Sequence, residues 1–158
     1  MVCTFRPHAL VLQAGQEMRI LNSDSIVHNT HTNPTVNSVF NQAIKAHETE
    51  GIPVVYSRPE RSPVKVICDF HPWMLAWHLP LDHPYGTVTV ADGTFTIADI
   101  PAGSHQFAIW HEGRKLMDYP VTINPNETTT VEIPIQGDAL LGRVDMNQLK
   151  TVVFSALP

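Results

Sequence analysis

Residues 66–74, VICDFHPWM, place a cysteine, a histidine and a methionine at equal spacing on one short segment. The three are Cys68, His71 and Met74, in a C-x2-H-x2-M pattern. A thiolate, an imidazole and a thioether are soft or borderline ligands, the kind of set that selects copper. A blue-copper site needs one more histidine, and the chain offers His28 upstream. This stretch therefore decides both the expected fold of the N-terminal half and its expected site.

The four residues predict a copper site at His28, Cys68, His71 and Met74. In such a site two imidazoles and a thiolate form a trigonal plane, a methionine sulfur lies weakly on the axis, and single electrons are exchanged. Each residue taken alone is more often part of a hydrophobic core. The order and spacing of the four favour a metal site. Structural zinc is disfavoured because the CxxC pairs typical of zinc sites are absent.

The expected roles of these side chains differ. Cys68 supplies the strong copper bond and the electron path, and Met74 tunes the potential. His28 and His71 fix the plane of the site. Asn29 either joins the two ligand loops by a hydrogen bond to backbone near the thiolate or is an ordinary turn residue.

The N-terminal half resembles the small cupredoxins, most closely those of the amicyanin type. The resemblance rests on the pair His28-Asn29, on the Cys-x2-His-x2-Met spacing with Pro72 after the histidine, and on residues 9–22 (ALVLQAGQEMRILN). The last stretch reads as a strand, a glycine turn and a second strand that ends in asparagine. The resemblance covers about residues 4–78 and implies a Greek-key sandwich with one type 1 copper ion. The family's usual first strand is expected to be missing from this chain or supplied from elsewhere.

The resemblance implies electron transfer with a redox partner protein, a cytochrome or a dehydrogenase, in the periplasm or outside the cell. The ring edge of His71, beside Pro72 and Trp73, is the expected route for electrons. We do not expect an enzyme, because catalysis needs an open coordination position or a second copper centre and a methionine on the axis closes the site. The alternative is a structural or assembly protein of the cell envelope with an ancillary copper site.

Composition narrows the class of protein. Thirteen prolines and eight glycines, spread among short β-branched runs in 158 residues, indicate an all-β chain of one sizeable or two small domains. A net charge of −5 argues against a nucleic-acid partner. Nine histidines exceed the need of one site, so His78, His83 and His111 offer a possible second metal site. Cys3 is either a buried thiol or the partner of a cysteine elsewhere.

Four strands are expected in the N-terminal half. They cover residues 8–13, 17–22, 53–57 and 64–69. Residues 33–51 are polar and irregular, which predicts a long surface loop. Within this loop, Ser38 to Ile44 is expected to form a turn of helix.

Five short strands at regular spacing predict a small sandwich in the second half. They are residues 86–90, 94–97, 104–111, 116–123 and 128–135, and the turn Ala91-Asp92-Gly93 joins the first two. This half resembles the carboxypeptidase regulatory-like, or transthyretin-like, module. The carrying residues are 92–95 (DGTF), 100–105 (IPAGSH) and 129–133 (TTVEI).

The expected domain organisation is a copper-binding domain at 1–82 and a transthyretin-like module at 84–136, joined by a very short linker. Residues 137–158 form an extension. Its strand-like segments 142–145 and 151–154 either complete the second sheet in permuted order or begin another module.

Overall fold

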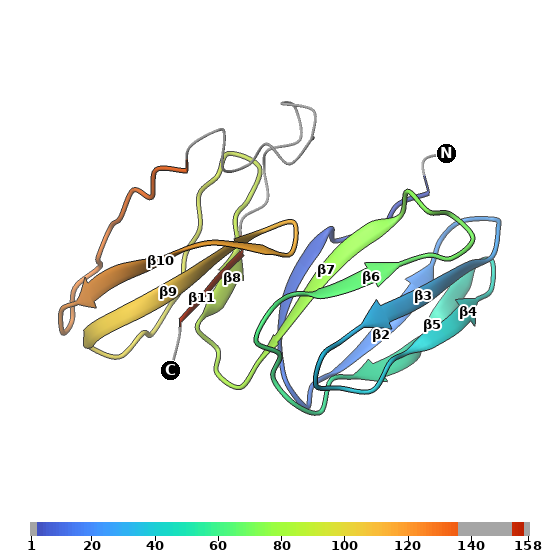
Figure 1. Ribbon diagram of the computed structural model, residues 1–158, viewed down its shortest axis with the longest axis horizontal. Helices are drawn as coiled ribbons and strands as arrows, with labels where there is room; N and C mark the ends of the chain where they lie inside the picture. The colour runs from blue at the N-terminus through green and yellow to red at the C-terminus, as the bar shows by residue number, and fades with distance from the viewer. Residues whose placement is uncertain (1–2, 136–152, 157–158) are drawn as a thin grey trace. The chain divides into compact units, whose positions relative to one another are not determined.

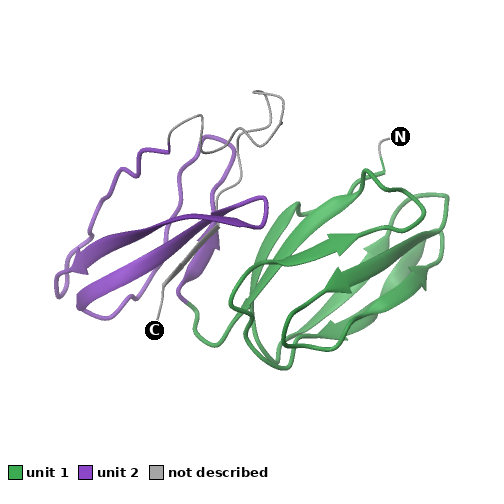
Figure 2. Ribbon diagram, viewed as in Figure 1, with its two compact units in different colours: residues 1–84 green, residues 85–158 purple. Residues whose placement is uncertain are grey.

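The computed structural model describes residues 3–135 and 153–156, and every regular element in this part of the chain is a β-strand. The all-β class predicted from the sequence is therefore confirmed. Within the same residues, no helix has the length and apolar character needed to cross a membrane. The chain forms two compact units, residues 1–84 and 85–158, which Figure 2 shows in different colours. Each unit is described by itself.

Unit 1 is built from two sheets, a mixed sheet of five strands and an antiparallel pair (Figure 1). The larger sheet has the order β1-β7-β6-β3-β4, in which β1 and β7 are parallel and the other neighbours antiparallel, and the smaller sheet pairs β2 with β5. The strands are β1 (Ala9–Gln13), β2 (Glu17–Asn22), β3 (His28–Asn33), β4 (Asn41–Ile44), β5 (Glu48–Val55), β6 (Val64–Ile67) and β7 (Leu75–Leu81).

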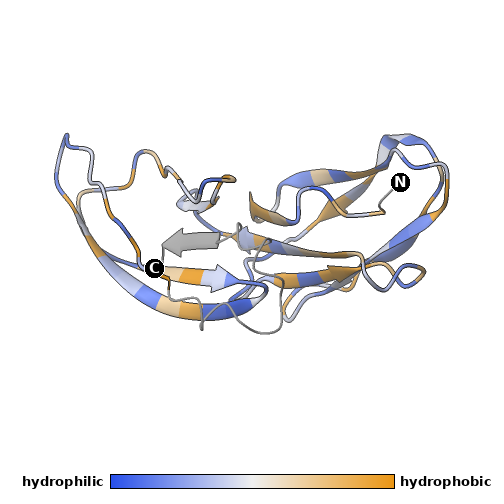
Figure 3. Cartoon of the chain, turned by 90° about the horizontal axis from the view of Figure 1, so that it is seen from above, coloured by the Kyte–Doolittle hydropathy of each residue, from blue (hydrophilic) through white to orange (hydrophobic). Residues whose placement is uncertain are grey.

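The core of unit 1 joins its two sheets. Leu12 of β1, Val64 of β6 and Tyr56, just after β5, form a buried cluster, and Met18 of β2 packs against it. Along β6 buried valines alternate with a more exposed residue, as expected of a strand with one face toward a core. Figure 3 shows the corresponding alternation of hydrophobic and hydrophilic residues along the strands. Burial of these apolar faces holds the sheets together.

Three of the four strands expected in this half coincide with β1, β2 and β6 to within two residues. The fourth, expected at 53–57, begins earlier, at Glu48 in β5. The helical turn expected at 38–44 is wrong, because Asn41–Ile44 forms strand β4 and pairs with β3 from His31↔Asn41 to His28↔Ile44. The irregular loop expected at 33–51 is wrong for the same reason, since β4 and the start of β5 lie within it.

Unit 2 contains one antiparallel sheet of order β10-β9-β11-β8. Its strands are β8 (Gly86–Val88), β9 (Gly103–His111), β10 (Arg114–Ile123) and β11 (Val153–Ala156). The expected strands at 104–111 and 116–123 are confirmed as β9 and β10. Their hairpin turns at Glu112 and Gly113, with φ of 48° and 72°, which is the left-handed pair that a two-residue type I′ turn requires. β11, from the C-terminal extension, lies between β9 and β8.

The strands expected at 94–97 and 128–135 are wrong, because neither segment joins a ladder. The turn before the first one does form, since the Gly93 N–H donates to the Val90 carbonyl and the Val90 N–H to the Thr94 carbonyl, both at 2.9 Å. The ladder does not continue beyond this turn. β8 ends at Val88 and is paired with β11 instead.

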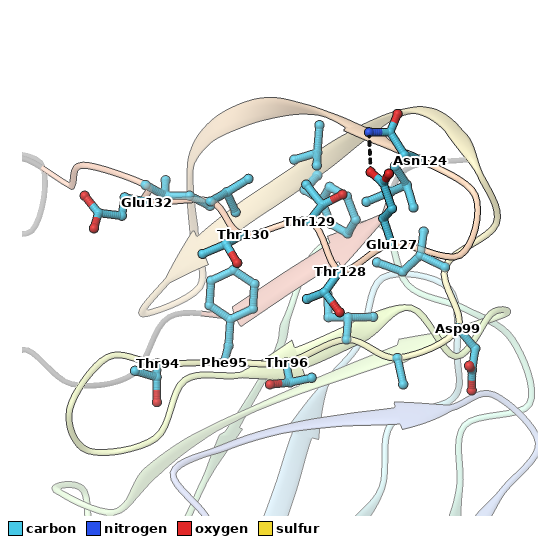
Figure 4. Close-up of a pocket in the computed structure, with 18 of the residues that line it drawn as sticks. Thr94, Phe95, Thr96, Asp99, Asn124, Glu127, Thr128, Thr129, Thr130 and Glu132 are labelled. Carbon is cyan, nitrogen blue, oxygen red and sulfur yellow. Dashed lines mark hydrogen bonds between the residues drawn. The ribbon is translucent and has the colours of Figure 1, made fainter.

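Both unpaired segments nevertheless keep a strand-like alternation. Phe95 and Ile97 are half-buried while Thr94 and Thr96 are exposed. The segments 92–100 and 124–135 line a hollow of about 1220 Å³ together with sheet residues such as Phe107. In Figure 4 the Phe95 ring points toward the segment that carries Thr130, whereas Thr94 points away. In these two segments the alternating pattern thus decides which side chains line the hollow, although the backbone forms no sheet.

Candidate metal centre

Strand pairing in unit 1 brings the two ligand segments of the sequence together. His28 is the first residue of β3, and Cys68 follows the last residue of β6. β3 and β6 are antiparallel neighbours that pair from His31↔Ile67 onward, so the segments around His28 and Cys68 meet at one end of the sheet. His71 and Met74 lie on the connection from β6 to β7.

The donor atoms of three predicted ligands converge. Nδ1 of His28 lies 3.0 Å from Nδ1 of His71, and Sγ of Cys68 lies 3.5 Å from the same His71 nitrogen. One donor atom from each residue lies within 4.8 Å of the other two. Cys68 is 1% exposed and His28 is 5% exposed, whereas His71 is partly exposed. A thiolate and two imidazoles in this arrangement can hold a metal ion.

Met74, the fourth predicted ligand, is buried on the same connection. Its backbone N–H donates to the His71 carbonyl at 2.9 Å, which closes a turn over the ligand segment. This turn fixes the backbone of Met74 relative to His71. The axial role of its sulfur stays a prediction.

Asp24 orients His28, and sequence reasoning missed it. Nε2 of His28 lies 2.9 Å from Oδ2 of Asp24. While Asp24 accepts this hydrogen bond, Nε2 carries the proton and the lone pair on Nδ1 faces His71 and Cys68. Asp24 is held in turn by its N–H, which donates to Oδ1 of Asn22 at 3.0 Å. The four-residue spacing of Asp24 and His28 was the available signal, but it is too common to be specific.

Asn29 joins the two ligand segments, as one of its two sequence interpretations predicted. Its Oδ1 accepts the Asp69 N–H at 2.6 Å, and its Nδ2 donates to Oδ2 of Asp69 at 2.6 Å. Its backbone N–H donates to Sγ of Cys68 at 3.4 Å. Asn29 lies within β3 and not in a turn. The backbone of β3 therefore contacts the sulfur of the ligand segment directly.

His31 and Asp69 form a second layer of polar contacts beside the centre. Nδ1 of His31 lies 3.0 Å from Oδ1 of Asp69, and Nδ2 of Asn41 donates to Oδ2 of Asp69 at 3.2 Å. Hydrogen bonds from His31, and then from Asn29, lower the pKa of the Asp69 carboxyl. Asp69 therefore remains an ionised acceptor for the Asn29 amide, and the ligand segment stays attached to β3.

The second metal site considered for the surplus histidines gains no support from His78. Its Nδ1 lies 3.1 Å from the hydroxyl of Tyr56, inside the core of unit 1. Burial lowers the pKa of His78 to about 4, so its imidazole is neutral at physiological pH. His111 belongs to the other unit, so it is not placed relative to His78.

Exposed apolar side chains surround the centre. Trp73 is 66% exposed and Phe70 58%, and both lie on the ligand segment next to His71. Ile26 and Val27, directly before His28, are also exposed. The rings of Trp73 and His71 meet edge-on with centroids 5.2 Å apart. Trp73 therefore lies at the surface of unit 1, beside His71.

No protein-family model, curated protein or solved structure matches the chain. The interpretation of this centre therefore depends on its own side chains. Their chemistry fits a soft or borderline metal ion, because a buried cysteine sulfur and two imidazoles converge and Asp24 contacts one of the imidazoles from its other nitrogen. Unit 1 contains a candidate metal centre at His28, Cys68 and His71.

Proposed function

We propose that unit 1 is a cupredoxin-like Greek-key sandwich that binds one type 1 copper ion and carries single electrons between redox partner proteins. The observation that carries the proposal is the convergence of the Cys68 sulfur with Nδ1 of His28 and of His71. Thiolate and imidazole donors, with the thioether of Met74 on the same segment, make up the set that selects copper. When bound, copper supplies one-electron chemistry by changing between its two oxidation states.

The surrounding residues keep the donors in place during such a change. Asp24 holds the ring of His28 by the hydrogen bond to Nε2. Asn29 holds the Cys68 segment against β3 from both its backbone and its side chain. Donors that are fixed by outer contacts do not move when the charge of the site changes, which favours fast electron exchange.

Electron transfer suits this site better than catalysis. A catalytic metal needs an open coordination position. In the proposed site, the thioether of Met74 would add a fourth protein donor to His28, Cys68 and His71 and leave no position open. Cys68 and Met74 are both buried, so a substrate would have to displace packed side chains. We therefore propose that the chain is not an enzyme.

Electrons would leave through the partly exposed His71. Phe70 and Trp73 make an apolar surface beside it. Small apolar patches suit brief, weak docking, in which interfaces are small. The proposed partner is a cytochrome or a dehydrogenase in the periplasm or outside the cell, where a copper carrier of this kind works.

A second candidate function is structural. The segments 92–100 and 124–135 of unit 2 have strand-like alternation without ladder partners and line a hollow. Such surfaces suit assembly with other proteins. In this alternative, unit 2 is a transthyretin-like module of a cell-envelope assembly, residues 137–158 extend it, and the copper site is ancillary.

The visible spectrum of the copper-loaded chain tests the proposal. Oxidised protein should show an intense thiolate charge-transfer colour that disappears on reduction. Cys68→Ser should abolish the colour, and Cys3→Ser, the matched control at the other cysteine, should keep it. A copper-loaded wild-type chain without this colour would overturn the proposal.

A further inference from the structure

A second group of metal-binding side chains overlaps the first one. Cys3, Asp24 and His28 each place one donor atom within 4.8 Å of the other two. Cys3 is half-buried and the Asp24 side chain is 23% exposed, so this group is more open to solvent than the buried Cys68. Cys3 has no role in the proposed copper site.

We propose that Cys3, Asp24 and His28 form a second metal site for a thiophilic divalent ion of the zinc class. A thiolate, a carboxylate and an imidazole are all established zinc ligands, and three protein ligands leave the fourth position of a tetrahedron to water. The site joins the local pair Asp24 and His28, four residues apart, to Cys3, which lies before β1. It is therefore formed by the folded unit 1 and not by a local motif.

The two sites share His28, and a neutral imidazole has one N–H and one lone pair. With the proton on Nε2, which faces Asp24 at 2.9 Å, the lone pair on Nδ1 faces His71 and Cys68. With the proton on Nδ1, which lies 3.0 Å from Nδ1 of His71, the Nε2 lone pair faces Asp24 instead. Each tautomer serves one site, so the two sites exclude each other.

This exclusion rests on the proposed copper function, whereas the second site does not. An ion at Cys3 and Asp24 takes His28 away from Cys68 and His71 and so opposes copper loading. Copper at the first site, in turn, leaves Cys3 and Asp24 without their imidazole. Because the two sites share His28, a common divalent ion could occupy the second site until copper binds at the first site and displaces it.

Cobalt(II), a visible substitute for zinc, tests the site in the full chain. Cys68→Ser removes the thiolate of the first site and keeps Cys3. We expect this variant to bind one Co²⁺ with a thiolate charge-transfer band, Cys3→Ser in the same background to abolish the band, and Asp24→Asn to weaken binding at least about tenfold. A folded Cys68→Ser chain without the band overturns the second site.

Alkylation of the wild-type chain gives a test that needs no variant. In the metal-free protein, zinc should slow the reaction of Cys3 with iodoacetamide at least about tenfold, as measured by peptide mass spectrometry. In the copper-loaded protein, zinc should leave that rate unchanged. Absence of zinc protection at Cys3 overturns the site, and protection in both forms overturns the exclusion.

The outcomes separate this inference from the proposed function. If copper-loaded wild type is coloured and Cys68→Ser shows no cobalt–thiolate band, only the second site fails. If Cys68→Ser shows the band and copper-loaded wild type is colourless, only the copper function fails.

Discussion

Units 1 and 2 both carry sequences with strand-like alternation, but they use them differently. In unit 1 each of the four expected strand segments overlaps a strand that has a ladder partner. In unit 2 the segments 94–97 and 128–135 have the same alternation and no ladder. The difference teaches that alternation selects which side chains face inward, while a free neighbouring edge decides whether the backbone becomes a strand.

The units also differ in the number of buried polar and charged side chains. Among the described residues, every buried polar or charged side chain except His111 belongs to unit 1. Glu60, for example, accepts hydrogen bonds from the backbone N–H groups of Thr35, Val36 and Asn37 and from the Thr35 hydroxyl. The loops of unit 1 are thus anchored by buried polar groups, which also makes this unit the more sensitive to pH.

The largest expected difference between the units is the loss of stability of unit 1 at low pH. Burial raises the pKa of Glu60, but hydrogen bonds from Thr35 and Asn37 outweigh it and lower the pKa to about 2, from 4.5. Burial lowers the pKa of His78 from 6.5 to about 4. In both cases the folded state binds fewer protons than the unfolded state, so stability is complete above the unfolded pKa and falls with pH. We expect a loss of about 3 kcal/mol from each group.

The loss should occur from pH 6.5 to about 4 for His78 and from pH 4.5 to about 2 for Glu60. Urea unfolding at each pH, followed in single-tryptophan variants that keep Trp77 in unit 1 or Trp110 in unit 2, measures it. His78→Gln should flatten the first step and Glu60→Gln the second. Equal acid sensitivity of the two units would remove this part of the comparison.

Packing inside unit 2 is expected to be uneven. Ile109 is 0% exposed in β9, so Ile109→Ala should cost about 4 kcal/mol of unfolding free energy. Phe95 only lines the hollow beside the sheet and is half-buried, so Phe95→Ala should cost about 1 kcal/mol although it removes more atoms. Denaturant unfolding measures both changes. Equal costs would show that the 94–97 segment is as well packed as the sheet.

A smaller effect is expected for the junction between the ligand segments. Asn29→Ala removes the hydrogen bonds to Asp69, and we expect copper affinity to fall by about 10- to 100-fold. Asn41→Ala removes one donor to the same carboxylate and should cost less. Competition with a copper chelator measures both. If the two variants bind copper equally well, Asn29 does not position Cys68.

The smallest effect is expected on the rate of electron exchange, from a change at Trp73, which is exposed beside His71. Trp73→Glu places a charge beside His71, so electron self-exchange between oxidised and reduced copies should slow by about tenfold. The colour should not change, because Trp73 donates no ligand. Val90→Glu, at an exposed apolar residue of unit 2, is the matched control and should leave the rate unchanged. A rate that is insensitive to Trp73→Glu would place the electron route elsewhere.

The sequence predicted what is local and missed what is long-range. Cys68, His71 and Met74 could be found because their spacing is set within one segment, and His28 because these three donors left one histidine to be supplied. Cys3 approaches His28 only through the fold, and the four-residue spacing of Asp24 and His28 is too common to single Asp24 out. Strand β7 could not be recognised because its parallel pairing with β1 joins distant parts of unit 1. Residues 41–44 were misassigned since their pattern is weak and pairing with β3 decides their conformation.

The pairing of β6 with β7 makes the ligand segment a part that can be exchanged. Ile67 and Leu75 are direct partners in the β6–β7 register, so residues 68–74 leave the sheet and return to it at a single paired position. The segment can therefore be exchanged as a cassette whose two ends are fixed by the scaffold. Changing its length would alter the distance between Cys68 and His71 while leaving His28, on β3, in place. Three of the four proposed donors thus lie on a segment that can be exchanged, and the fourth, His28, lies on a strand of the sheet that stays unchanged.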